Sequence, residues 1–86
     1  MPESTGKDTA VRLDLVGLKC PLPVLCTRKA LAAMAPKTLL EVVANDPMSL
    51  IDIPHLLTAT GDTLLEQHGE AGVVRFLIRK GDGSRQ

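Results

Sequence analysis

The sequence predicts an α/β (α+β) fold, a two-layer sandwich in which two helices cover one face of a four-stranded mixed sheet. Three observations favour this fold. A chain of 86 residues has room for one small domain. Four short apolar segments have the pattern of strands and two others the composition of helices, in the order β-α-β-α-β-β. Hydrophobic residues make up 44% of the chain and aromatic residues only 1%, so an aliphatic core is expected.

The first half of the domain predicts a strand, a helix and a second strand. Apolar and polar residues alternate over 11–15, as in a half-buried strand, and Gly17 ends it. Ala, Leu, Lys, Arg and Met dominate residues 21–34, which indicates a helix closed by Pro36. Residues 39–44 are aliphatic and β-branched and predict the next strand.

Residues 45–47, Asn-Asp-Pro, form a turn and capping sequence that precedes a second helix. Pro54 complicates this helix, because a proline in a helix interior removes one hydrogen bond and clashes with the preceding turn. We therefore expect a short turn over 47–51, followed by a helix over 52–60 that Gly61 ends.

Two more strands are predicted over 63–68 and 73–80, and the Gly-Glu-Ala-Gly sequence of 69–72 joins them as a hairpin. The polar ends of the chain contain nothing to bury. We therefore expect three parts, which are a flexible N-terminal tail over 1–10, the domain over 11–80 and a flexible C-terminal tail over 81–86.

The net charge is zero, with ten basic and ten acidic residues, which argues against direct nucleic-acid binding through bulk positive charge. The near absence of aromatic residues also argues against stacking on bases. The charges are nevertheless segregated, because residues 17–40 hold four basic residues and no acid, whereas 41–70 hold six acids and no Lys or Arg. We expect a basic neighbourhood around any site in 17–40.

No apolar run approaches the ~18 residues of a membrane span, and the N-terminus is polar, so a cytoplasmic protein without a membrane partner is expected. The two cysteines, Cys20 and Cys26, are too few for a disulfide scaffold and lack the spacing of a zinc site. We expect both to be reduced thiols, with no metal and no cofactor. Because no apolar patch is obvious, a monomer is expected.

Residues 17–23, Gly-Leu-Lys-Cys-Pro-Leu-Pro, lie where the first strand ends and the first helix begins. Prolines are tolerated in the first helical turn, so Pro21 and Pro23 are expected to fix Cys20 at the helix start. The positive end of the helix dipole and the neighbouring Lys19 should stabilise a thiolate there, and equally a persulfide anion. We interpret Cys20 as a reactive thiol; the alternative is a small residue packed under the sheet edge.

The rest of the sequence limits what this thiol can do. A cysteine hydrolase needs a histidine base, and the sequence places neither His55 nor His68 to serve Cys20. There is no Cys-x-x-Cys pair for a dithiol cycle. A single activated thiol can still accept a group and pass it on.

The first helix carries a candidate docking surface for a partner protein. Leu25 and Arg28 project from the flank opposite the apolar face, one turn beyond Cys20. Cys26 lies at the margin of the apolar face and is interpreted as a packing residue. A chain this small either does one simple thing or works with partners.

Several short motifs follow one another along residues 11–80. They are Leu13-Asp14, the Gly17-to-Pro23 motif, Arg28-Lys29, Asp46-Pro47, Asp52-Ile53-Pro54 and Leu77-Ile78-Arg79-Lys80. Together they resemble the TusA/SirA-like family of small sulfur-carrier proteins. The resemblance implies the same β-α-β-α-β-β sandwich. It also implies that Cys20 accepts sulfane sulfur as a persulfide from a cysteine desulfurase or rhodanese-like donor and passes it to an acceptor protein.

The resemblance therefore makes the chain a sulfurtransferase in the sense of a persulfide carrier, with partner-docking positions at Leu25, Arg28 and Asp46. In the best-known relay of this family, the sulfur reaches 2-thiouridine in tRNA. Two positions depart from the tRNA-thiolating members, because Leu22 stands where they have Glu and Asn45 where they have an acid. Sulfur oxidation, molybdenum cofactor and selenium metabolism are therefore alternative routes.

A second hypothesis is a non-catalytic regulatory or adaptor module. It would bind its partner through Leu25 and Arg28, and Cys20 would be structural. In the leading hypothesis Cys20 is catalytic, Lys19 and the helix start stabilise its anion, and Pro21 and Pro23 hold its geometry. Gly17, which ends the strand before the motif, is a further supporting residue.

Overall fold

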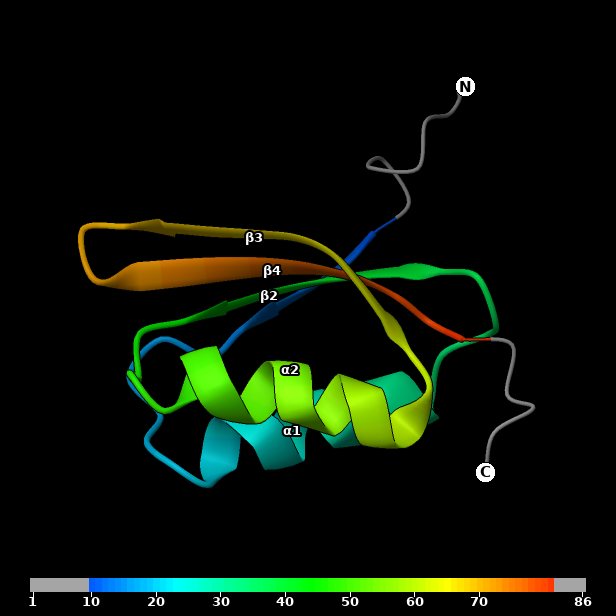
Figure 1. Cartoon of the computed structure of the whole chain (residues 1–86), viewed down its shortest axis with the longest axis horizontal. Helices are drawn as coiled ribbons and strands as arrows, with labels where there is room; N and C mark the ends of the chain where they lie inside the picture. Colours follow the sequence, from blue (N-terminus) through cyan, green and yellow to red (C-terminus); the bar gives the residue numbers. More distant parts are fainter. Residues whose placement is uncertain (1–9, 82–86) are drawn as a thin grey trace.

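Helices and strands follow one another in the order β-α-β-α-β-β, as the sequence predicts. The computed structural model describes residues 10–81, so the expected tails lie outside the described residues except for Ala10 and Gly81. The elements are β1 (Val11–Asp14), α1 (Leu22–Ala32), β2 (Leu39–Ala44), α2 (Ser49–Thr60), β3 (Thr63–Glu70) and β4 (Val73–Arg79) (Figure 1). Among residues 10–81, no helix is long and apolar enough to cross a membrane.

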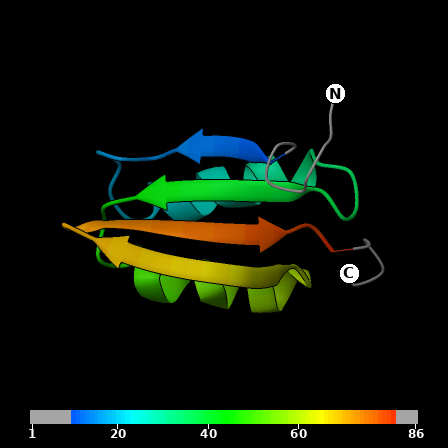
Figure 2. The same cartoon turned by 90° about the horizontal axis from the view of Figure 1, so that it is seen from above.

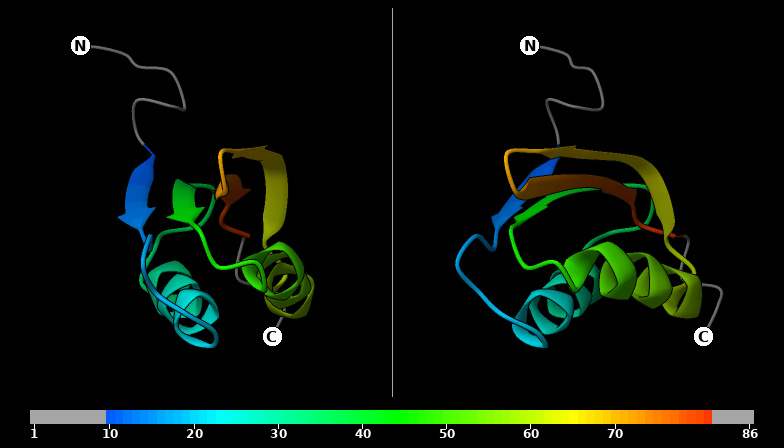
Figure 3. Two further views of the ribbon diagram at one scale, coloured as in Figure 1. Left: turned by 90° about the vertical axis from the view of Figure 1, so that its left-hand side faces the viewer. Right: turned by 60° about the vertical axis from the view of Figure 1, so that its left-hand side comes forward.

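The four strands form one mixed sheet in the order β1-β2-β4-β3 (Figure 2). β1 pairs with β2 in parallel, and β4 pairs antiparallel with both β2 and β3. Both helices lie on one face of the sheet, which gives the predicted two layers (Figure 3). Because β1 and β2 are parallel, their carboxyl ends meet at the same end of the sheet, where α1 and α2 also begin (Figure 1). The loops after β1 and β2 therefore lie side by side.

The core lies between the sheet and the helices, and Phe76 is its one aromatic residue. Alternate residues of β4, Val74, Phe76 and Ile78, point into it and are at most 9% exposed. The other buried residues of the core come from β2, the position directly after β1 and the two helices, namely Leu15, Leu31, Leu40, Val42, Ala44, Ile53 and Leu57. Burial of this aliphatic surface holds both helices against the sheet, and so fixes the loops that connect them.

The second helix begins earlier than predicted and continues through Pro54. It begins at Ser49, because the N–H groups of Ser49 and Leu50 already donate to carbonyls three residues back. Pro54 leaves only the carbonyl of Leu50 without its helical donor, and Leu50 is exposed, so water can take the donor's place. The prediction of a separate turn over 47–51 is therefore wrong, and Asp52 lies inside the first turn of α2.

Other element ends also differ slightly from the prediction, because β1 ends at Asp14 and α1 begins at Leu22. α1 ends at Ala32, and β4 ends at Arg79. β3 continues to Glu70, which leaves a hairpin loop of only Ala71 and Gly72, with φ of 55° and 83°. Positive φ at both positions matches the right-handed twist of the strands, so a two-residue loop suffices.

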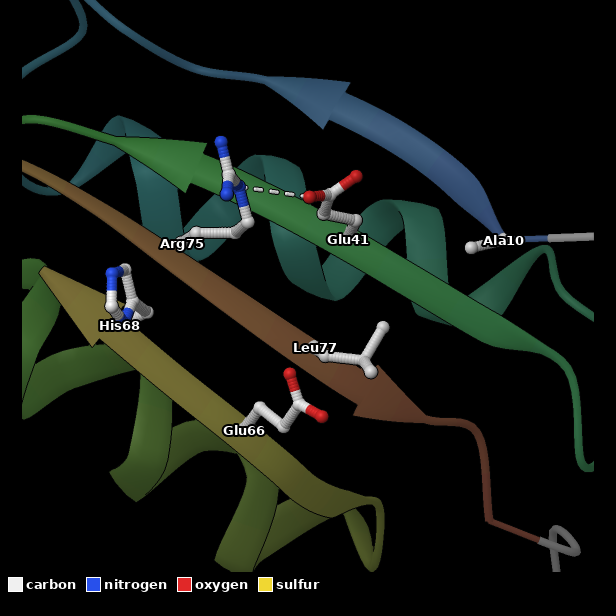
Figure 4. A pocket seen from close by; sticks show the side chains of 6 residues that line it. All are labelled: Ala10, Glu41, Glu66, His68, Arg75 and Leu77. Carbon is white, nitrogen blue, oxygen red and sulfur yellow. Dashed lines mark ion pairs between the residues drawn. The ribbon is translucent and has the colours of Figure 1, made fainter. Parts of the chain in front are cut away.

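The sheet face away from the helices is open. Here Glu41 of β2 lies between Arg12 of β1 and Arg75 of β4, with N–O distances of 3.2 and 2.9 Å. A shallow hollow on this face is lined by Ala10, Glu41, Glu66, His68, Arg75 and Leu77 (Figure 4). Charged side chains, rather than a second layer of helices, therefore cover this side of the sheet.

Candidate functional site

Cys20 lies in the loop between β1 and α1, at the end of the sheet where both helices begin (Figure 1). Its thiol is exposed and is not part of a disulfide. α1 begins at Leu22 with Pro21 as its N-cap, and Pro23 is buried in the first turn, so the two prolines flank the helix start. Gly17 turns the loop with a φ of 97°, which a residue with a Cβ rarely adopts.

Two hydrogen bonds tie the Cys20 loop to the loop after β2. The N–H of Gly17 donates to Oδ1 of Asn45 at 2.9 Å, and the N–H of Cys20 donates to Oδ2 of Asp46. Asp46 is only 8% exposed, and its Oδ1 accepts the N–H of Met48 at 3.4 Å. Because both oxygens of Asp46 are turned toward backbone donors, this residue holds the Cys20 loop, and the docking role that the resemblance implies stays a prediction.

Asp52 brings a second carboxylate to the cysteine. From the first turn of α2, its Oδ2 accepts a hydrogen bond from Cys20 Sγ over 3.6 Å. The sequence analysis includes Asp52 in a motif without assigning it a role. In the sequence, only its position near the predicted start of the second helix could have pointed to Asp52. The predicted helix begins at residue 52, three residues later than α2 does in the structure.

The pKa of the Cys20 thiol is raised above its ordinary value. Partial loss of hydration is the largest cause, followed by the hydrogen bond to Asp52 and the negative charges of Asp52 and Asp46, all of which favour the neutral thiol. The surroundings of the free thiol therefore favour its neutral form, whereas the stabilisation of an anion by the helix start and Lys19 stays a prediction. The acidic segment 41–70 folds against the basic segment 17–40, so carboxylates that are 26 and 32 positions away reach the cysteine.

Large apolar side chains are exposed at the same end of the molecule as Cys20. They lie at the starts of the two helices and are between 43% and 64% exposed, namely Leu22, Leu25, Met48, Leu50 and Ile51. Arg28 is exposed one turn further along α1. The sequence analysis does not expect these exposed residues on both helices, and a docking surface that includes them stays a prediction. Exposed apolar residues gathered near a site suit contact with another protein.

The remaining candidates lie away from the thiol. Cys26 is half-buried and packs against the core, as expected of a packing residue. His55 is exposed on α2, and His68 lies on the open sheet face with its Nε2 3.9 Å from Glu70. Within residues 10–81, no hydrogen bond joins either histidine to Cys20, and no cluster of His, Cys, Asp and Glu could hold a metal ion.

An exposed thiol in the loop before a helix, on a two-layer α/β sandwich, is the arrangement expected of a protein that carries a group on sulfur. Residues 11–80 match the family model described as sulfurtransferase TusA. The chain therefore belongs to the TusA family of sulfur carriers, as the motifs indicate.

Known relatives agree with this assignment over most of their length. The chain is 44% identical over 68 residues to the sulfur carrier protein TusA of Allochromatium vinosum, covering 79% of this chain and 90% of the relative. It is 43% identical over 68 residues to the sulfur carrier protein TusA of Pseudomonas aeruginosa, covering 86% of that protein. The crystal structure of a SirA-like protein from Desulfitobacterium hafniense matches with a TM-score of 0.66 at 26% identity, covering 83% of this chain and 97% of that one.

Proposed function

We propose that the protein carries sulfane sulfur as a persulfide on Cys20. The observation that carries this proposal is the exposure of the Cys20 thiol beside an apolar surface, whereas the other cysteine, Cys26, is packed against the core. A structural cysteine would be expected inside the core, so the exposure of Cys20 also disfavours the adaptor hypothesis. Gly17, Pro21 and Pro23 hold the loop that presents the thiol.

The transfer needs no oxidant or cofactor. The thiolate of Cys20 attacks the outer sulfur of a persulfide on the donor protein, and a new S–S bond forms. The bond between the two donor sulfurs breaks, and its electron pair leaves with the donor cysteine as a thiolate. In the second step a thiolate of the acceptor attacks the outer sulfur on Cys20 in the same way, and the electron pair returns to Cys20.

The donor in this proposal is a cysteine desulfurase or a rhodanese-like protein, and the acceptor is a second protein with a reactive cysteine. Both dock on the exposed apolar residues at the starts of α1 and α2, with Leu25 and Arg28 at the centre of the contact. We place this exchange in the cytoplasm, where thiols stay reduced, with the carrier as a monomer. Thiolation of tRNA is the first route to test, although Leu22 and Asn45 reduce negative charge relative to the members that serve it.

Sulfur loading can be tested by intact mass spectrometry. The protein is incubated with a cysteine desulfurase and cysteine, and in parallel with a rhodanese and thiosulfate. We expect one added sulfur atom in the wild-type protein and in Cys26→Ser, and none in Cys20→Ser. Thiol reductant should remove the added sulfur. No gain of sulfur with either donor, or a gain that persists in Cys20→Ser, would contradict the proposal.

A further inference from the structure

Asp52 has no part in the transfer as written above, yet its carboxylate contacts the reacting sulfur. Oδ2 of Asp52 lies 3.6 Å from Cys20 Sγ, whereas the carboxylate of Asp46 is engaged by the N–H groups of Cys20 and Met48. Asp52 is anchored in the first turn of α2, next to the fully buried Ile53, so its position relative to the Cys20 loop is fixed by the core.

The charged groups around the sulfur come from three segments. Asp52 faces it from α2, Asp46 lies under it in the loop after β2, and Lys19 precedes it in its own loop. The first turn of α1 contributes no acid. A carboxylate at hydrogen-bond distance can accept a proton-bearing S–H but repels a thiolate, so it favours the neutral and poorly nucleophilic form of Cys20.

We propose that Asp52 is a specificity residue that keeps Cys20 unreactive in the free carrier and so restricts loading to protein donors. The inference rests on the proposed function. In the free carrier, a small electrophile reacts slowly with Cys20, because the cysteine is a neutral thiol hydrogen-bonded to Asp52. A docked donor with a basic side chain over Asp52 neutralises that carboxylate, so that Cys20 can release its proton and attack the outer sulfur of the donor. The donor cysteine leaves as a thiolate with the electron pair of the broken S–S bond, and then takes up that proton.

The first test is the pH dependence of alkylation of the empty thiol by iodoacetamide, in a Cys26→Ser background so that only Cys20 reports. Asp52→Asn keeps the shape of the side chain and removes its charge. We expect its alkylation near neutral pH to be about fivefold faster, with the whole rate profile moved to lower pH. Asp52→Glu retains the charge, so its alkylation rate should lie between those of the background protein and Asp52→Asn. Glu66→Gln, which removes a carboxylate from the open sheet face, should match the background protein.

The second test compares two ways of loading the same variants with sulfur. Inorganic polysulfide should load Asp52→Asn faster than the background protein by the same factor as alkylation. Loading by a cysteine desulfurase should show no such gain, because the variant also loses the carboxylate over which the basic side chain of the donor docks. An unchanged alkylation profile in Asp52→Asn, with the fold intact by circular dichroism, would overturn the proposal. An equal gain with both sulfur sources would also overturn it. Alkylation does not depend on sulfur transfer. If the protein never accepts sulfur, the proposed function is refuted, but the alkylation rates still show whether Asp52 suppresses the reactivity of Cys20.

Discussion

Asp46 joins three segments of the chain at a single carboxylate. It follows β2, accepts the N–H of Cys20 from the loop after β1, and accepts the N–H of Met48 just before α2. Its burial removes water as a competing partner, so each of these donors would be left without an acceptor if the carboxylate were lost. The position of the thiol therefore depends on an acid that does not contact the sulfur.

Replacement of Asp46 tests this role at the level of stability. We expect Asp46→Ala to lower the free energy of unfolding by about 2 kcal/mol, because two N–H groups lose their acceptor in a poorly hydrated place. Asp46→Asn keeps one oxygen acceptor and should cost clearly less. Urea denaturation followed by circular dichroism measures both. Equal losses for the two variants would show that hydrogen bonding to this side chain is not what holds the loop.

At this scale the sequence predicts the nucleophile but not its surroundings. Residues 17–23 alone predict that the proline-flanked Cys20 is a reactive thiol, and the structure shows it exposed. Its raised pKa comes first from partial loss of hydration and then from Asp52 and Asp46, which are 32 and 26 positions away in the sequence and are brought to it by the fold. Lys19 is next to Cys20 in the sequence and so enters the prediction, whereas the two carboxylates approach the thiol only in the folded chain.

At the scale of elements, periodicity and composition predict all six elements and their order. The largest error concerns the start of α2, because Pro54 is read as a barrier to the helix. A proline within a helix costs one hydrogen bond, and this cost is small where the orphaned carbonyl belongs to an exposed residue such as Leu50. Burial of Ile53 and Leu57 on the same helix outweighs it. Such tertiary compensation is not visible in a local sequence.

The hairpin between β3 and β4 contains an avoidable strain. Ala71 adopts a φ of 55°, a conformation that costs free energy for a residue with a Cβ, and Gly72 follows with 83°. Asparagine tolerates this conformation, and Asn-Gly is a preferred pair for a two-residue loop of this kind. We expect Ala71→Asn to raise the free energy of unfolding by about 0.5–1 kcal/mol.

The matched control for the hairpin is Gly72→Ala, which puts a Cβ on the second left-handed position and should lower the free energy of unfolding by about 1 kcal/mol. The melting temperatures of the two variants and the wild-type protein, measured by circular dichroism, test both expectations. A melting temperature that falls with Ala71→Asn would mean that the loop does not hold both residues at positive φ in solution.

At the scale of the whole molecule, the open sheet face has no helices to cover it. Its centre is Glu41, whose side chain is 25% exposed and bridges Arg12 and Arg75 across three strands. This arrangement compensates two cations with one anion. Without the Glu41 carboxylate, the guanidinium groups of Arg12 on β1 and Arg75 on β4 flank β2 with no negative charge between them.

The Glu41 network should be weak and sensitive to salt. We expect Glu41→Gln to lower the free energy of unfolding by about 1 kcal/mol at low ionic strength, and by less in high salt, because salt screens the exposed charges. Urea denaturation at two salt concentrations measures the difference, with Glu66→Gln as the comparison on the same face. A loss that is unchanged by salt would point to packing rather than charge.

The strand directions also decide where the described chain enters and leaves the sheet. Val11 at the start of β1 lies level with Leu40 of β2, which in turn pairs with Ile78 near the end of β4. Ala10 and Gly81 therefore lie at the end of the sheet remote from Cys20 (Figure 2). A fusion partner, an affinity handle or a surface linker joined beyond either residue is attached behind the thiol. The described part of the carrier can thus be joined to a surface at Ala10 or Gly81, at the end of the sheet remote from the Cys20 thiol.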